Sequence, residues 1–236
     1  MYNEQIEYLV WDSNFFKKKI GSIFVKNIDS LKEILKESTI SGFQLVYVFC
    51  NNDLFVHDSV LGQYNGKLID IKILYEKEIK ILKEQSIFVS EYKNKELTTE
   101  LELLAYEAGR YSRFKLDKNF EKNDFYRMYK IWIKESLEHQ MADNVFVVKE
   151  DDIIKGMITL KDNNENGNIG LCAVSPDMQN RGYGKALVTT CENELYHKGI
   201  FKLDVPTQAG NINACKFYEK CGFYKKEITN IYHFWL

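Results

Sequence analysis

The sequence predicts a protein of the α/β (α+β) class, with a small N-terminal α/β domain at residues 1–88 and a larger second domain at residues 89–236. Strand-like and helix-like apolar patterns alternate along the first domain. In the second domain two amphipathic helices come first, and several strands with alternating side chains follow. No repeat, low-complexity tract or Pro/Gly/Ser-rich linker separates the two parts. The boundary therefore rests on this change in element order.

Composition and charge exclude several classes of protein. A chain of 236 residues with 45% hydrophobic content can bury one large core or two smaller ones. The formal net charge is −2 with both signs interspersed, so no basic field attracts nucleic acid or an acidic membrane. The first residues lack a signal-peptide pattern, and no apolar run approaches the roughly 20 residues that span a bilayer. We expect a cytoplasmic protein, with its oligomeric state open and a homodimer included.

The metal-ligating residue types show no ligand spacing. The odd number of cysteines within apolar patterns predicts buried free thiols rather than disulfides, and the histidines carry no assigned role. These residues are Cys50, Cys172, Cys191, Cys215 and Cys221, with His57, His139, His197 and His233. We expect no metal site.

Apolar periodicity predicts the elements of the first domain. Residues 20–27 are strand-like, residues 31–38 form a short amphipathic helix, and residues 43–50 suit a strand covered on both faces. A third strand is expected within residues 67–78. The motif Trp11-Asp12-Ser13-x-Phe15-Phe16 is interpreted as packing of this domain rather than as a ligand contact.

A short strand is expected at residues 87–92, across the boundary, and two helices follow it in the second domain. Thr99-x-x-Glu102 resembles a capping box, and Gly109 is expected to end the first helix. The apolar positions of this helix are Leu101, Leu104, Ala105 and Ala108. The second helix, residues 124–138, is expected to bury Phe125, Met128, Trp132 and Ile133.

Strands and helices then alternate to the end of the chain. Two runs with alternating side chains, joined by Asp151-Asp152, predict a hairpin. The elements expected in order are strands 145–150, 153–161 and 168–174, a helix 182–198, a strand 201–205, a helix 212–221 and closing strands within residues 223–236.

The segment from Val174 to Val188 predicts an anion-binding site. A strand ends at a proline turn, and a glycine-containing loop leads directly into an amphipathic helix. Gly182 and Gly184 permit backbone angles closed to other residues, so that successive N–H groups converge at the positive end of the helix. Arg181 and Lys185 add local charge, although Lys185 lies inside the helix and is equally compatible with a solvated position.

A lone G-x-G at a helix start is a weak signal, and this one is neither a Walker loop nor a dinucleotide fingerprint. A second segment, Asn211-x-x-Ala214-x-x-x-Tyr218-Glu219-Lys220-x-Gly222-Phe223, follows after one strand. Together with Gln179-x-x-Gly182-x-Gly184, it resembles the GNAT superfamily of acetyl-CoA-dependent N-acetyltransferases. The resemblance covers roughly residues 90 to 236 and implies the acyl-CoA acyltransferase fold, a mixed sheet with helices on both faces.

The resemblance also implies how acetyl-CoA would be held. The strand ending at Val174 would separate from its neighbour, and backbone groups of Cys172, Ala173 and Val174 would pair with the pantetheine arm and polarise the thioester carbonyl. Asn211 would lie beside the arm, and the Tyr218 hydroxyl would protonate the departing thiolate. The pyrophosphate would lie on the loop Gln179, Asn180, Arg181, Gly182, Tyr183 and Gly184.

Tyr218 and Cys172 each have a structural alternative. Tyr218 shares the apolar face of its helix with Phe217 and Ala214, where a tyrosine is commonly part of the core. Cys172 lies in an apolar strand, which favours inert packing over covalent catalysis.

Two further segments resemble the dTDP-fucosamine acetyltransferase branch: the opening residues 8–16, and Gly109-Arg110-Tyr111-Ser112-Arg113-Phe114-x-x-Asp117-x-x-Phe120. This resemblance implies acetylation of the 4-amine of dTDP-4-amino-4,6-dideoxy-galactose, a nucleotide sugar used for surface polysaccharide. Arg110, Tyr111 and Arg113 are the expected acceptor contacts, because guanidinium groups bind diphosphates. Alternatively, Arg110 caps its helix and Arg113 forms a surface ion pair.

Two other functions remain open from the sequence. One is acetylation of a protein N-terminus, a polyamine or another small amine. The other is an acyl-CoA-binding module without catalysis. No residue stands out as the general base.

Overall fold

The computed structural model describes residues 5–236, whose contacts group into two compact units. Unit 1 runs to Ile73 and adds residues 208–210 and 227–236. Unit 2 comprises residues 74–207 and 211–226. This grouping differs from the contiguous domains expected at 1–88 and 89–236, because strands β4 (Gly66–Glu78) and β10 (Tyr224–Trp235) each contribute to both units.

Unit 1 is built on strands in the order β1-β2-β3-β10-β4. β2 and β3 are parallel, with Ile20 opposite Leu45, and β10 is antiparallel to β3. The elements are β1 (Glu7–Tyr8), α1 (Val10–Phe16), β2 (Ile20–Val25), a 3-10 turn η1 (Ile28–Ser30), α2 (Leu31–Ile40), β3 (Leu45–Asn51) and α3 (Asp58–Gln63). The strands and the amphipathic helix expected from periodicity are confirmed.

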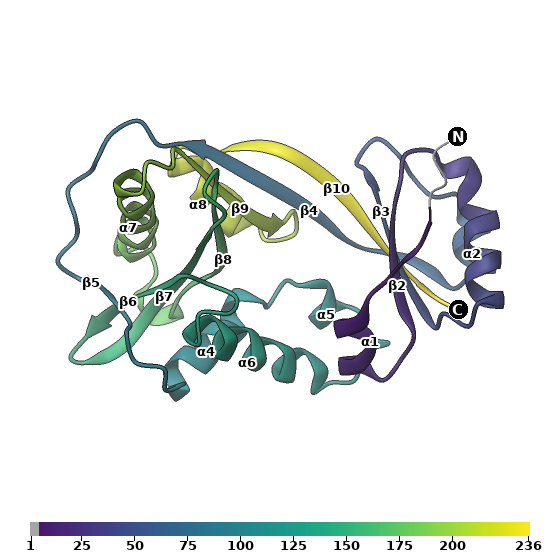
Figure 1. Ribbon diagram of the computed structural model, residues 1–236, viewed down its shortest axis with the longest axis horizontal. Helices are drawn as coiled ribbons and strands as arrows, with labels where there is room; N and C mark the ends of the chain where they lie inside the picture. The colour runs from purple at the N-terminus through teal and green to yellow at the C-terminus, as the bar shows by residue number, and fades with distance from the viewer. Residues whose placement is uncertain (1–4) are drawn as a thin grey trace. The chain divides into compact units, whose positions relative to one another are not determined.

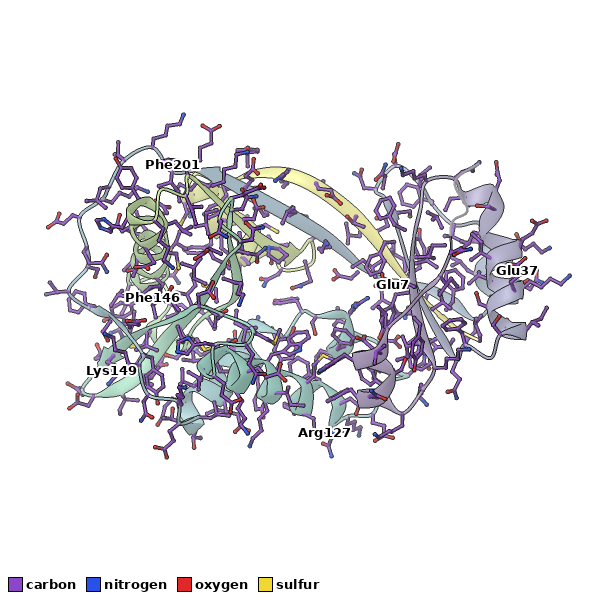
Figure 2. The ribbon with its side chains drawn as sticks, viewed as in Figure 1. Glu7, Glu37, Arg127, Phe146, Lys149 and Phe201 are labelled. Carbon is purple, nitrogen blue, oxygen red and sulfur yellow. The ribbon has the colours of Figure 1, made fainter. Side chains whose placement is uncertain are left out.

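The core of unit 1 forms where α2 covers this sheet. Leu31 and Leu35 of α2 are fully buried against Val46 and Val48 of β3. Figure 2 shows Glu37 on the opposite face of α2, pointing away from this core. The alternation of these side chains at helical spacing is the reason that this segment folds as an amphipathic helix.

The packing interpretation of the motif at residues 11–16 agrees with the structure of α1. The Ser13 hydroxyl accepts a hydrogen bond from the Ile20 N–H at 3.0 Å, and Phe16 is buried. Trp11 stacks on Phe15, with ring centroids 5.0 Å apart and the planes 7° from parallel. The Ser13–Ile20 hydrogen bond joins α1 to the start of β2, whereas the aromatic stacking lies within α1.

Unit 2 contains the strand order β10-β4-β9-β8-β7-β6-β5 (Figure 1). Its helices are α4 (Thr99–Ala108), α5 (Arg113–Leu116), α6 (Asp124–Leu137), α7 (Tyr183–His197) and α8 (Ile212–Lys220). Its further strands are β5 (Val89–Glu91), β6 (Asn144–Glu150), β7 (Ile153–Asp162), β8 (Gly167–Val174) and β9 (Lys202–Gln208), and a 3-10 turn η2 (Pro176–Met178) follows β8. The predicted α/β class is confirmed, including a mixed sheet.

Helices cover both faces of the unit 2 sheet. Leu101 and Leu104 of α4, with Ile133 of α6, pack on Leu171 and Ala173 of β8. Trp132, expected in this core, lies partly buried at its edge. On the other face, α7 packs so closely on β8 that a Cβ on Gly167 would lie 2.3 Å from the Leu195 side chain.

The hairpin of β6 and β7 is confirmed. Asp151 and Asp152 both take positive φ angles, 48° and 64°, as a two-residue type I′ turn requires. Short polar side chains tolerate this conformation better than bulky ones, which explains the charged turn.

Two predicted details are wrong. The N-cap of α4 is Thr98, whose hydroxyl accepts from the Leu101 N–H, and Glu102 instead accepts from the Tyr106 hydroxyl and pairs with Lys130. The capping box at Thr99 therefore does not form. The closing strands are a single strand, β10, because no glycine or proline interrupts residues 224–235.

Candidate active site

The site is built around the separation of two parallel strands in unit 2. β8 and β9 pair only at Gly167 with Leu203 and at Asn168 with Asp204. β8 nevertheless continues to Val174 and β9 to Gln208. The separation expected from the resemblance is confirmed.

A β-bulge in β8 accounts for the separation. Ile169 pairs with Leu160 and Cys172 with Ile158, so that Gly170 and Leu171 both lie opposite Thr159 alone. The Leu171 N–H is satisfied by the Thr159 hydroxyl at 2.8 Å. Since a bulge bends its strand and increases the local twist, β8 leaves β9 directly after the last ladder pair. Peptide groups from Gly170 to Val174 on the β9 side can therefore pair with an extended ligand.

Tyr218 of α8 lies beside β8 at this separation. Its side chain is 5% exposed, and its hydroxyl lies close to the Cys172 thiol, so that each group shifts the pKa of the other. Burial raises the pKa of Tyr218 well above its ordinary value. The phenol is therefore protonated throughout the physiological pH range, as a general acid must be.

Cys172 has the properties of an inert thiol. Burial raises the pKa of Cys172 to about 12, although the Tyr218 hydroxyl acts in the opposite direction. A nucleophilic cysteine requires a thiolate, which this environment disfavours. The geometry thus agrees with packing at this position and does not favour covalent catalysis.

Tyr75 of β4 holds Tyr218 in place, a role that sequence reasoning missed. Tyr75 is fully buried, its ring centroid lies 6.1 Å from that of Tyr218, and its hydroxyl donates to Glu219 Oε1 at 2.9 Å. Phe223 packs on the other side of Tyr218 at 5.6 Å. No local pattern distinguishes Tyr75 from an ordinary strand tyrosine, because its partners come from more than 140 positions later, as the separation of 144 residues to Glu219 shows.

The loop before α7 presents backbone amides at a helix N-terminus. The Gln179 side chain donates to the Val174 carbonyl at 3.2 Å, which fixes the loop to the end of β8. Gly182 is the N-cap, with φ at 87°. Ala186 is the first residue whose N–H bonds back into the helix, to the Gly182 carbonyl. The preceding amides lie at the positive end of a helix of 15 residues, where their unpaired N–H groups are suited to an anion.

The two glycines of this loop serve different purposes. Of the two glycines, only Gly182 has a left-handed backbone conformation. Asn180 in the same loop also has a positive φ, at 63°. Gly184 lies within α7, where a Cβ would approach the Phe217 ring to 3.1 Å. The expectation of a special backbone angle at Gly184 is therefore wrong, and this glycine instead allows α7 and α8 to pack closely.

Of the remaining expected cofactor residues, Arg181 and Tyr183 belong to this loop and Asn211 begins α8. Arg181 Nη1 is 3.8 Å from Glu150 Oε1 and is largely exposed. Tyr183 packs edge to face with Phe88 at 6.1 Å, and Phe88 is 55% exposed. Asn211 is the N-cap of α8, where its side-chain oxygen accepts from the Ala214 N–H at 3.2 Å.

The expected acceptor residues follow α4 in sequence. Arg110 donates to Glu107 at 2.7 Å and to the Tyr111 hydroxyl at 3.0 Å, so it forms a surface ion pair rather than a helix cap. Arg113 begins α5, with its guanidinium 4.6 Å from the centre of the Phe114 ring. Both guanidinium groups thus lie against aromatic rings of the same segment.

Within residues 5–236, the structure shows no cluster of three or more histidine, cysteine, aspartate or glutamate side chains suited to a metal ion. In the same range, no helix combines the length and apolar character needed to cross a bilayer.

Comparisons with known proteins agree with this geometry. The sequence profile described as "Acetyltransferase (GNAT) family" matches residues 102–223. No curated protein sequence matches the chain.

Solved structures show the same fold at low sequence identity. A conserved protein of unknown function from Staphylococcus epidermidis ATCC 12228 has a TM-score of 0.69 at 9% identity, over 100% of this chain and 92% of that one. A GCN5-related N-acetyltransferase from Sphaerobacter thermophilus has a TM-score of 0.57 at 13% identity, over 91% of this chain and 72% of that one. The expected fold is confirmed.

Proposed function

The chain belongs to the acetyltransferase (GNAT) family, and from this premise we propose that it transfers the acetyl group of acetyl-CoA directly to an amine. The observation that carries the proposal is the separation of β8 from β9 beside the Tyr218 hydroxyl. At this place the pantetheine arm finds free peptide groups to bind, and the leaving thiolate finds a proton donor.

The described residues suit the parts of acetyl-CoA. Peptide groups of Cys172, Ala173 and Val174 pair with the amides of the pantetheine arm, and one N–H polarises the thioester carbonyl. The pyrophosphate lies on the amides from Gln179 to Gly184, where the helix N-terminus supplies positive potential without a net basic protein. The Gln179 contact to Val174 couples these two subsites.

Tyr218 completes the reaction at the sulfur. The neutral amine nitrogen attacks the thioester carbon, the carbon–sulfur bond breaks, and the Tyr218 proton moves to the thiolate. The nitrogen loses one proton to solvent and the Tyr218 phenolate regains one, so that the products are the amide and the CoA thiol. A phenol and a thiolate have comparable proton affinities. Burial raises the pKa of Tyr218 and of the neighbouring Cys172 thiol. A CoA thiol buried at the same place would shift in the same direction, so the two proton affinities would stay comparable.

For the acceptor we propose the 4-amine of dTDP-4-amino-4,6-dideoxy-galactose. The support is the segment from Gly109 to Phe120, which resembles the dTDP-fucosamine branch and follows α4 on the face of the sheet opposite α7. Arg110 and Arg113 offer planar guanidinium groups to a diphosphate, and Tyr111 offers a ring to a base or sugar. Arg110 would exchange its surface partner Glu107 for the diphosphate, at little cost because the pair is exposed.

The proposal is tested by CoA release from acetyl-CoA in the presence of a panel of amines. The panel contains dTDP-linked 4-amino and 3-amino sugars, peptides with free N-termini, and polyamines. We expect the highest kcat/KM with a 4-amino nucleotide sugar, and acetylation of its amine by mass spectrometry. Turnover highest with peptides or polyamines would contradict the sugar assignment. No turnover with any amine, despite acetyl-CoA binding, would leave a binding module.

A further inference from the structure

Asp204 is an acidic residue inside the sheet at the point where β8 and β9 separate. It forms the last ladder pair, with Asn168, and is 7% exposed. Oδ2 accepts from the Asn166 side chain at 3.2 Å and lies 3.6 Å from Lys226 Nζ. Oδ1 is buried and has no hydrogen-bond partner among the residues that the structure describes. An ionised carboxylate is costly in such a place, so its presence calls for a reason.

Lys226, the cation beside Asp204, also pairs with a second carboxylate, Glu76. Glu76 of β4 accepts hydrogen bonds from the Tyr224 hydroxyl and from Lys226 Nζ, and these bonds lower the pKa of Glu76. Burial raises the pKa of Asp204, and the charge of Glu76 raises it further against the effect of Lys226. Lys202, on the same strand as Asp204, also lowers the pKa of Glu76. Two neighbouring carboxylates with pKa values pushed apart form the usual arrangement of a proton acceptor beside a fixed anion.

Asp204 lies on the face of the sheet opposite Tyr218. On β4, Tyr75 contacts Glu219 of α8 and Lys77 contacts Glu192 of α7. Side chains of a strand alternate between faces, so Glu76, between them, points to the other face. Asp204 joins Glu76 there through Lys226.

The face that carries Asp204 is also the one covered by α4 and α6. Leu171 and Ala173 of β8 pack against these helices, while Cys172 between them turns to Tyr218. The segment with the proposed acceptor contacts follows α4. An amine that enters from this face reaches the strand separation on the side of Asp204, and the thiolate leaves on the side of Tyr218.

We propose that Asp204 is the proton acceptor for the amine, acting through one ordered water at the strand separation. The inference rests on the proposed function. The proton leaves the substrate ammonium for the water, and a water proton moves to Asp204 Oδ1. The freed lone pair attacks the thioester carbon, the carbon–sulfur bond breaks, and the thiolate takes the proton of Tyr218. The nitrogen then loses its second proton to solvent, and the Tyr218 phenolate and Asp204 exchange protons with solvent, so that a neutral amide, the CoA thiol and the resting enzyme remain. Because acceptor and donor lie on opposite faces, the two proton transfers do not compete.

The variant Asp204→Asn keeps the shape of the side chain and an oxygen to accept from Asn166. At pH 7 we expect kcat/KM to fall about 100-fold, within the range of general-base contributions. The loss of kcat/KM relative to the wild type should shrink as the pH approaches and passes the pKa of the amine, because the free amine then needs no proton acceptor. An equal loss at every pH, or no loss at pH 7, would overturn the proposal.

Stability separates this role from a structural one. Folding raises the pKa of Asp204, so the ionised carboxylate disfavours the folded state, and this cost is present above the folded pKa and absent below the unfolded pKa. At pH 8 the melting temperature of Asp204→Asn should therefore equal or exceed that of the wild type, with acetyl-CoA affinity unchanged. A marked drop in melting temperature would assign Asp204 to the core instead.

A second variant should shift the pH profile of kcat/KM while the Asp204 side chain itself stays unchanged. Lys226→Met removes the cation and leaves Asp204 facing Glu76, so the acidic limb of kcat/KM should shift to higher pH. An unshifted limb would contradict the assignment. Wild-type turnover on the amine panel is the prior control: without it the proposed function fails, whereas turnover that Asp204→Asn leaves intact at pH 7 defeats only this inference.

Discussion

Replacing Tyr218 with phenylalanine should lower turnover about 100-fold or more while the affinity for acetyl-CoA stays within about twofold of the wild type. General acid catalysis increases the rate by about 10²- to 10⁴-fold. The hydroxyl removed here lies beside the Cys172 thiol, where the leaving sulfur is expected. Phenylalanine keeps the ring that packs against Tyr75 and Phe223. Steady-state kinetics and calorimetric titration with acetyl-CoA measure the two quantities.

Tyr232→Phe is the matched control for this prediction. Tyr232 is another buried tyrosine, in unit 1, whose hydroxyl accepts from the Val56 N–H at 3.3 Å. Loss of its hydroxyl leaves the buried Val56 N–H without an acceptor, which should cost about 1 to 3 kcal/mol of stability and leave kcat unchanged. If Tyr218→Phe turns over as fast as the wild type, Tyr218 is a core residue and the mechanism needs another proton donor.

Replacing Glu192 with glutamine should produce the largest loss of stability in unit 2. Glu192 of α7 is 1% exposed, and its two oxygens pair with Lys77 and Lys83. Lys77 also donates to the Cys221 carbonyl at the end of α8. Burial lowers the pKa of Lys77, against the effect of Glu192, so removing the carboxylate leaves a poorly solvated ammonium.

Breaking a buried pair costs about 3 to 5 kcal/mol. Since Lys83 is about a third exposed, we expect the low end, about 3 kcal/mol, or a melting temperature lower by about 6 to 10 °C. Glu194→Gln on the same helix is the control, because its pair with Lys198 is accessible to solvent and should contribute below about 1 kcal/mol. Equal effects of the two substitutions in thermal unfolding would show that the buried network is not stabilising.

Local sequence patterns predicted the helices and strands better than they predicted which strands pair in the sheet. The α2 and α6 helices, the hairpin at Asp151-Asp152 and the loop before α7 follow from periodicity and turn chemistry within short windows. The pairing of β10 with β3 joins residues about 180 positions apart, as Asn230 opposite Cys50 shows, and no local signal encodes it. The placement of β4 between β10 and β9 is likewise long-range, and it brings Tyr75 and Glu76 to the site in unit 2.

The sequence did contain one signal for Asp204 that periodicity alone passes over. A single carboxylate within the apolar strand at residues 201–205 is unfavourable unless something compensates it. Gly184 is the opposite case, in which a residue of the expected type is present for another reason. Its missing side chain accommodates Phe217, a contact that appears only when α7 and α8 are placed together.

The separation of β8 and β9 as the acetyl-CoA site is tested most directly by a crystal structure of the protein with acetyl-CoA. We predict the pantetheine arm along β8 between Gly170 and Val174, the thioester beside Tyr218, and the pyrophosphate on the amides that precede Ala186. Acetyl-CoA bound elsewhere, or β9 paired with β8 as far as Val174, would contradict the account.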